Sequence, residues 1–137
     1  MSDANKTLAR EYFRAFGSDD RAWMQEHIRP DYVRHDTNLP FEVKGPEGVG
    51  RLADVLHGAF SEIELDIQDV IAEGDKVLVR LQFRGRHSGA FGDHPATGRR
   101  FDVMVLDLFR MEGGKVAEQW PAIDNLGLQR QIGMLAG

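Results

Sequence analysis

The spacing of apolar residues changes once along the chain, from a helical period to a strand period. In the N-terminal part, apolar positions recur every three to four residues, which predicts helices over residues 2–16, 18–29 and 46–60. We expect Gly17 to end the first helix, and Pro30 to end the second because proline removes a backbone donor. A short strand over residues 32–36 and a loop over residues 37–45 lead to the third helix.

From residue 63 onward the period is two, which is typical of strands. Strands are predicted over residues 63–68, 76–84, 101–111 and 115–123, with glycine-containing turns at 73–76 and 112–114. A polar loop fills residues 85–100, and a short helix over residues 126–135 closes the chain. Because the helices and the strands occupy separate parts of the sequence, we expect an α+β fold in a single domain over residues 1–137.

The predicted strand 101–111 is apolar on both faces. Phe101, Val105 and Phe109 mark one face, and Met104 and Leu108 mark the other. A strand of this kind is usually covered on both sides. One face would meet the helices and a cavity, and the other would meet a second sheet or a partner subunit, so we expect a homodimer or homotetramer.

Composition excludes several classes of function. The chain has 137 residues, no cysteine and a net charge of -5, which rules out disulfides and thiolate chemistry and argues against a nucleic-acid partner. No apolar run reaches the ~20 residues of a membrane span. The N-terminus has no apolar signal core, so we expect a cytoplasmic protein. The five histidines show no metal-binding spacing, and no nucleotide fingerprint occurs, so neither a metal ion nor a cofactor is expected.

Asp107 is the leading catalytic candidate, because it lies in phase with Val105 and Phe109 on an apolar face. Burial there would raise its pKa toward values useful to a general base. The alternative is a carboxylate that pairs with an arginine or a backbone amide. A two-residue turn at Gly113 and Gly114 would place Asp107 opposite Trp120.

The other register is a three-residue turn with a bulge. It would place Asp107 opposite Gln119 and line the cavity with Asp107, Gln119 and Pro121.

Further candidates lie in the loops and on the aromatic positions. His35 and Asp36 end the short first strand, where a neutral histidine could abstract a C–H proton, although such a pair also suits a turn. Asp124 could face the pocket or, as we favour, cap the closing helix. His87 is expected to anchor its loop. The remaining candidates for substrate binding are Asn38, Gln119, Trp120, Phe13 and Phe83.

Several motifs together resemble one known family. They are Arg34-His35-Asp36 with Gly45-Pro46-Glu47-Gly48, then Glu73-Gly74-Asp75-Lys76-Val77, then Gly85-Arg86-His87-Ser88-Gly89, and finally Phe109-Arg110-Met111-Glu112-Gly113-Gly114-Lys115. In this order they resemble the SnoaL-like polyketide cyclases of the NTF2-like superfamily. The resemblance implies a cone formed by a curved, mostly antiparallel sheet, with three N-terminal helices enclosing an apolar pocket.

The resemblance also implies an activity and a site. Polyketide cyclases of this group carry out an intramolecular aldol ring closure without a metal or an organic cofactor, using an acid/base Asp supported by a His. Matched residue by residue, the Asp position holds Pro121 and the His position holds Asp107. Related ketosteroid isomerases carry their base near the position of His35.

We therefore expect a cofactor-free enzyme of the cyclase or isomerase type that acts on a bulky apolar or aromatic carbonyl compound. Asp107 or His35 would be the base, and Gln119 or Asn38 would hydrogen-bond the enolate oxygen. The alternatives are a non-catalytic small-molecule-binding or protein-interaction module, and a cofactor-independent hydroxylase or epoxide hydrolase. Convergence of Asp107 and His35 on one cavity would favour the enzyme over the binding module, and a position on opposite faces of the sheet would weaken the enzyme hypothesis.

Overall fold

The computed structural model describes residues 2–135, which form four helices and six strands. The helices are α1 (Ser2–Ser18), α2 (Arg21–His27), α3 (Gly45–Ala59) and α4 (Asn125–Gln131). The strands are β1 (Ile28–Arg34), β2 (Val43–Lys44), β3 (Phe60–Glu73), β4 (Lys76–His87), β5 (Arg100–Glu112) and β6 (Lys115–Ile123). The predicted α+β class, with three helices before most of the sheet, is confirmed.

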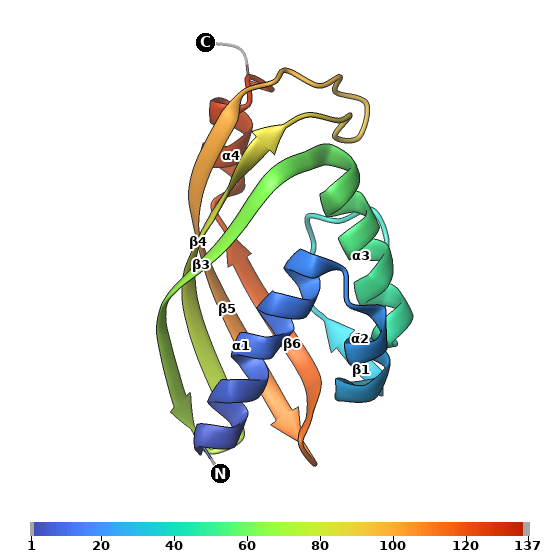
Figure 1. Ribbon diagram of the computed structural model, residues 1–137, viewed down its shortest axis with the longest axis vertical. Helices are drawn as coiled ribbons and strands as arrows, with labels where there is room; N and C mark the ends of the chain where they lie inside the picture. Colours follow the sequence, from blue (N-terminus) through green and yellow to red (C-terminus); the bar gives the residue numbers. More distant parts are fainter. Residues whose placement is uncertain (1, 136–137) are drawn as a thin grey trace.

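The strands form one curved sheet in the order β2-β1-β6-β5-β4-β3. All neighbouring pairs are antiparallel except β1 and β6, which run parallel. Figure 1 shows the sheet curving around α1, with α2 and α3 beside α1 and α4 at the same end as the loop between β4 and β5. The predicted curved, mostly antiparallel sheet is therefore confirmed.

Several predicted boundaries are wrong: the first strand spans Ile28–Arg34 and not residues 32–36, and the strand predicted over residues 63–68 spans Phe60–Glu73. Pro30 does not end the second helix, because α2 already ends at His27 and Pro30 lies within β1. The pairing of β1 with β6 is irregular between Ile28 and Val33, so a residue without an N–H group is tolerated there. Residues 85–87 were expected in the loop, but they extend β4, where Gly85 pairs with Phe101.

The hairpin between β5 and β6 differs from both predicted registers. Gly113 and Gly114 form a two-residue turn with φ of 60° and 76°, values that favour glycine. Ala117 is then an extra residue in β6, because Met111 pairs with Val116 whereas Arg110 pairs with Glu118.

As a result Asp107 lies opposite Pro121, and not opposite Trp120 or Gln119. The face predicted by the second register is nevertheless correct, because Asp107 and Gln119 are both buried on the concave side.

The convex face of the sheet carries no second sheet in residues 2–135. Ile71, Leu78, Leu108 and Trp120 are paired in one row across β3, β4, β5 and β6. Ile71 is 62% exposed and Leu78 is 37% exposed. The expected partner subunit on this face stays a prediction.

No helix within residues 2–135 has the length and apolarity needed to cross a membrane.

Candidate functional site

A cavity of about 140 Å³ lies between the concave face of the sheet and helices α1 and α3. Most of its wall is aliphatic or aromatic, as expected of a small-molecule site. The predicted ligand contacts Phe13 and Phe83 both line it, as do Leu52, Leu56, Phe60, Leu65, Leu81, Phe91, Val105 and Leu128. Only a few polar side chains reach this wall, and they are Tyr12, Arg34, Asp36, Asn38, Asp107 and Asn125.

Asp107 is held in the cavity wall by a short relay of buried hydrogen bonds. Gln119 Nε2 donates to Asp107 Oδ1 at 2.7 Å, and the Tyr32 hydroxyl donates to Gln119 Oε1 at 2.6 Å. Within residues 2–135 no hydrogen bond engages Asp107 Oδ2. Burial raises the pKa of Asp107 to about 6, although Arg34 and the bond from Gln119 act in the opposite direction. This carboxyl group can therefore exchange a proton near neutral pH.

Arg34 and Asp36 form a buried ion pair beside Asp107. Arg34 Nε and Asp36 Oδ2 are 3.2 Å apart, and the two side chains are only 7% and 6% exposed. Asp36 Oδ1 also accepts the backbone N–H of Asn38 at 3.0 Å. Burial opposes the charge on Arg34, but the neighbouring carboxylates and tyrosines raise its pKa above the ordinary value. The site thus combines two carboxylates with one fixed cation.

Tyr12 brings a hydroxyl group from α1 to the same wall. The residue is 2% exposed, and the hydroxyl makes no hydrogen bond with the residues that the structure describes. Burial raises its pKa, with Arg34 and Asp107 close enough to act on it in opposite directions. The group stays protonated at neutral pH and can donate a hydrogen bond.

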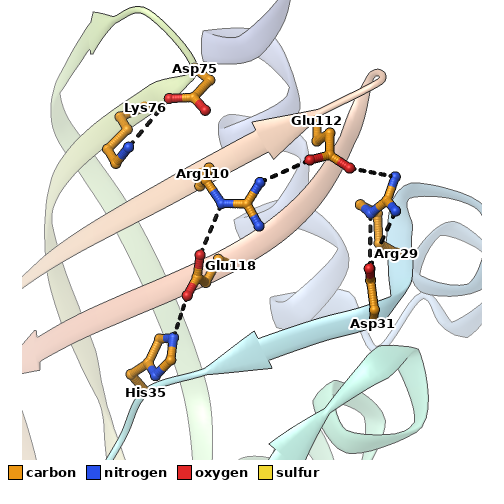
Figure 2. A network of polar contacts seen from close by, with 8 residues as sticks. All are labelled: Arg29, Asp31, His35, Asp75, Lys76, Arg110, Glu112 and Glu118. Atoms are coloured by element: carbon orange, nitrogen blue, oxygen red, sulfur yellow. Dashed lines mark hydrogen bonds and ion pairs between the residues drawn. The ribbon is translucent and has the colours of Figure 1, made fainter.

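His35 does not reach the cavity, which corrects the second catalytic prediction. Its Nε2 pairs with Glu118 Oε2 at 2.6 Å on the convex face, and its ring stacks on Trp120. Figure 2 shows Glu118 held in turn by Arg110, in a network that runs across β5, β6 and β1. Trp120 is therefore not a cavity contact either. Because His35 and Asp107 lie on opposite faces of the sheet, the expected convergence of these two residues on one cavity is wrong, and the enzyme hypothesis loses that support.

The other candidates divide between the cavity and structural roles. Asn38 lines the cavity, whereas Gln119 and Pro121 do not. Gln119 is fully buried behind the cavity wall, where its amide bonds Tyr32 and Asp107, so it is not placed to bind a substrate oxygen as expected. Asp124 caps α4 by accepting the N–H of Gly127 at 2.9 Å, as we favoured.

His87 anchors its loop as predicted. Its Nδ1 lies 3.0 Å from Thr97 Oγ1, and its backbone N–H donates to Arg99 O.

Arg34, Tyr12 and Tyr32 were not predicted as site residues. The signal for Arg34 was present, because strand alternation places Tyr32, Arg34 and Asp36 on one face and His35 on the other. The hydroxyl of Tyr12 has no comparable signal. At helical spacing beside Phe13 and Phe16, a tyrosine looks like any core aromatic residue.

Comparisons with known proteins show the family and the fold of the chain. A family model described as SnoaL-like polyketide cyclase matches residues 6–132. An aklanonic acid methyl ester cyclase of Streptomyces sp. (strain C5) is 35% identical over 114 residues, which cover 80% of this chain and 66% of the cyclase. The chain thus spans about two-thirds of that relative.

Two further relatives match over nearly their whole length. The nogalonic acid methyl ester cyclase of Streptomyces nogalater is 32% identical over 123 residues, 87% of this chain and 90% of the cyclase. The solved structure of TsrD from Streptomyces laurentii superposes with a TM-score of 0.87 at 30% identity, covering 98% of both chains.

Proposed function

Because the chain belongs to the SnoaL-like polyketide cyclase family, we propose that it closes a ring in an apolar polyketide by an intramolecular aldol reaction, with Asp107 as the acid/base group. The observation that carries this proposal is the Asp107 carboxyl group, which is buried in an apolar cavity wall and has its pKa raised to about 6. A base with such a pKa is well matched to proton transfer at neutral pH.

The proposed reaction needs two proton transfers and one new carbon–carbon bond. Asp107 Oδ2 takes the proton from a carbon next to a carbonyl, and the electron pair of the broken C–H bond forms an enolate. The enolate carbon then attacks a second carbonyl of the same molecule, and the resulting alkoxide recovers the proton from Asp107. No atom or electron is gained or lost, so the step needs no co-reactant.

The position of Asp107 also suggests how the family pattern is altered in this chain. Pro121, which we aligned with the family's acid/base Asp, cannot transfer a proton. In the ladder between β5 and β6, Asp107 is the direct partner of Pro121. We propose that the proton-transfer role has moved across one strand, from the position of Pro121 to that of Asp107.

Turnover of a polyketide methyl ester tests the proposal. The relatives' names make aklanonic acid methyl ester and nogalonic acid methyl ester the first substrates to try. We expect Asp107→Asn to lower kcat/KM by roughly a hundredfold or more, the usual contribution of a positioned general base. The matched control is Asp102→Asn, because Asp102 lies on the same strand but pairs with Arg84 on the convex face.

The pH dependence gives a second readout. The wild-type rate should rise with pH through an apparent pKa near 6 and then level off, because Asp107 must be ionised to accept the proton. Full activity of Asp107→Asn would remove Asp107 from the mechanism. A rate that is flat between pH 5 and pH 8 would contradict its assignment as the base.

A further inference from the structure

We propose that Arg34, with the hydroxyl of Tyr12, binds the substrate oxygen on which negative charge develops when Asp107 removes the proton. This inference rests on the proposed function, since it names the groups that receive the charge created by the reaction. It replaces Gln119 in that role, because Gln119 is fully buried and does not line the cavity.

Most N–H donors of the Arg34 guanidinium group make no hydrogen bond within residues 2–135. Arginine carries five N–H donors. Among residues 2–135, the only hydrogen bond that Arg34 donates from its side chain runs from Nε to Asp36 Oδ2. The side chain is 7% exposed, yet it lines the cavity. Donors buried beside a cavity without protein partners are suited to bind a ligand oxygen.

The charges of the site favour the same assignment. Before the reaction, Asp36 and Asp107 share the single positive charge of Arg34. When Asp107 becomes neutral by accepting the proton, the charge it carried reappears on the enolate oxygen. Arg34 then exchanges one anionic neighbour for another, so its attraction is transferred to the enolate at the moment the enolate forms. Asp36 remains the partner that holds Nε and fixes the orientation of the guanidinium plane.

Tyr12 supplies the second donor. Its hydroxyl is enclosed, lacks a partner among the described residues and lies on the same wall as Arg34. A buried hydroxyl without a hydrogen bond is costly, and a substrate oxygen would satisfy it. Together, Tyr12 and Arg34 approach the cavity from α1 and from the end of β1, so a ligand oxygen would be held between two independently anchored groups.

The experiment measures oxyanion binding without turnover. The probe is 1,2-dihydroxyanthraquinone, a tricyclic phenol whose neutral and ionised forms differ in colour. Its pKa is titrated by visible absorption when bound to Asp107→Asn, a variant that imitates the neutral Asp107 present beside the enolate. We expect the bound phenol to ionise at least tenfold more readily than in water, a pKa lowered by one unit or more.

Substitutions in the same background identify the groups responsible. Adding Arg34→Met should reverse the effect by roughly a factor of ten to a hundred in the ionisation constant, as expected for losing a charge at contact distance. Adding Tyr12→Phe should reverse part of it. Adding Arg110→Met, which removes an arginine from the convex face, should leave the bound pKa unchanged.

The proposal is overturned if the bound phenol ionises as it does in water, or if Arg34→Met and Arg110→Met give the same bound pKa. If Arg34→Met prevents folding, the comparison is made with Tyr12→Phe instead. An unchanged pKa of the bound phenol in that variant would contradict the proposed role of Tyr12. Failure of cyclase turnover with a lowered bound pKa would instead remove the proposed reaction and keep the oxyanion site.

Discussion

Replacing the proposed base should make the protein more stable, and the gain should depend on pH. Burial raises the pKa of Asp107 from its ordinary value of 3.8 to about 6, so the ionised form is disfavoured in the folded state. Each pH unit of such a difference corresponds to about 1.36 kcal/mol. At pH 8, Asp107→Asn should therefore increase the free energy of unfolding by about 3 kcal/mol, which is roughly 10 °C in Tm for a chain of this size.

The sign of the pH dependence follows from the direction of the shift. A carboxyl group whose folded pKa is raised costs stability above that pKa, and the cost disappears as the pH falls below the unfolded value. The advantage of Asp107→Asn should be complete at pH 8, decline through pH 6 and vanish below pH 4. Comparison with wild type at each pH removes the contribution of the surface carboxylates, several of which have lowered pKa values.

Urea unfolding monitored by the fluorescence of the two tryptophans measures this difference. Asp102→Asn is again the control, because hydrogen bonds from Gln82 and Arg84 hold the pKa of Asp102 below its ordinary range. That variant should show no gain at pH 8. Equal stability of wild type and Asp107→Asn at pH 8 would refute the argument, since it would mean that the ionised carboxylate is fully satisfied by its surroundings.

Four further outcomes follow from the structure. Gln119→Leu should lower the free energy of unfolding by about 1–3 kcal/mol in urea at pH 7, because it leaves two buried polar groups without partners; a neutral effect would contradict the relay. His35→Ala should leave the cyclisation rate within about twofold of wild type, since the ring lies on the convex face; a large loss would place it in the mechanism. Burial lowers the pKa of His87, so protonation below pH 6.5 should loosen its loop, and amide exchange of residues 88–99, corrected for intrinsic rates, should accelerate between pH 7 and pH 5. Light scattering should give wild type about twice the mass of the 15.4-kDa chain and Leu108→Arg the mass of one chain, whereas a monomeric wild type would exclude the expected dimer.

The sequence pattern was sufficient to predict that Asp107 faces the core, because strand alternation strongly constrains which side chains share a face. Val105 and Phe109 had to face the core, so Asp107 between them faced it too. The same argument applied to β1 would have predicted that Arg34 and Asp36 face the cavity and that His35 faces away from it. The prediction for His35 failed because it relied on the residue type and its place in the family pattern, and not on the alternation around Tyr32.

Other features were beyond the reach of a local pattern. The exact partner of Asp107 depends on the bulge at Ala117, and nothing in the composition of residues 115–123 marks that position. The proposed role of the Tyr12 hydroxyl depends on Arg34, which is distant in sequence and reaches the same cavity wall only in the folded chain. The expected helices and hairpins needed no such long-range information, which is why they were largely correct.

The bulge at Ala117 also bears on how the length of this hairpin can vary. Val116 and Ala117 both point toward the core, and together they oppose a single residue of β5. One additional residue is thereby absorbed near the turn, and the remainder of β6 keeps its phase. Loss of Ala117 would leave Arg110 beside Glu118 and Asp107 beside Pro121. Removal of this one residue should therefore shorten the hairpin without exchanging the side chains that face the cavity.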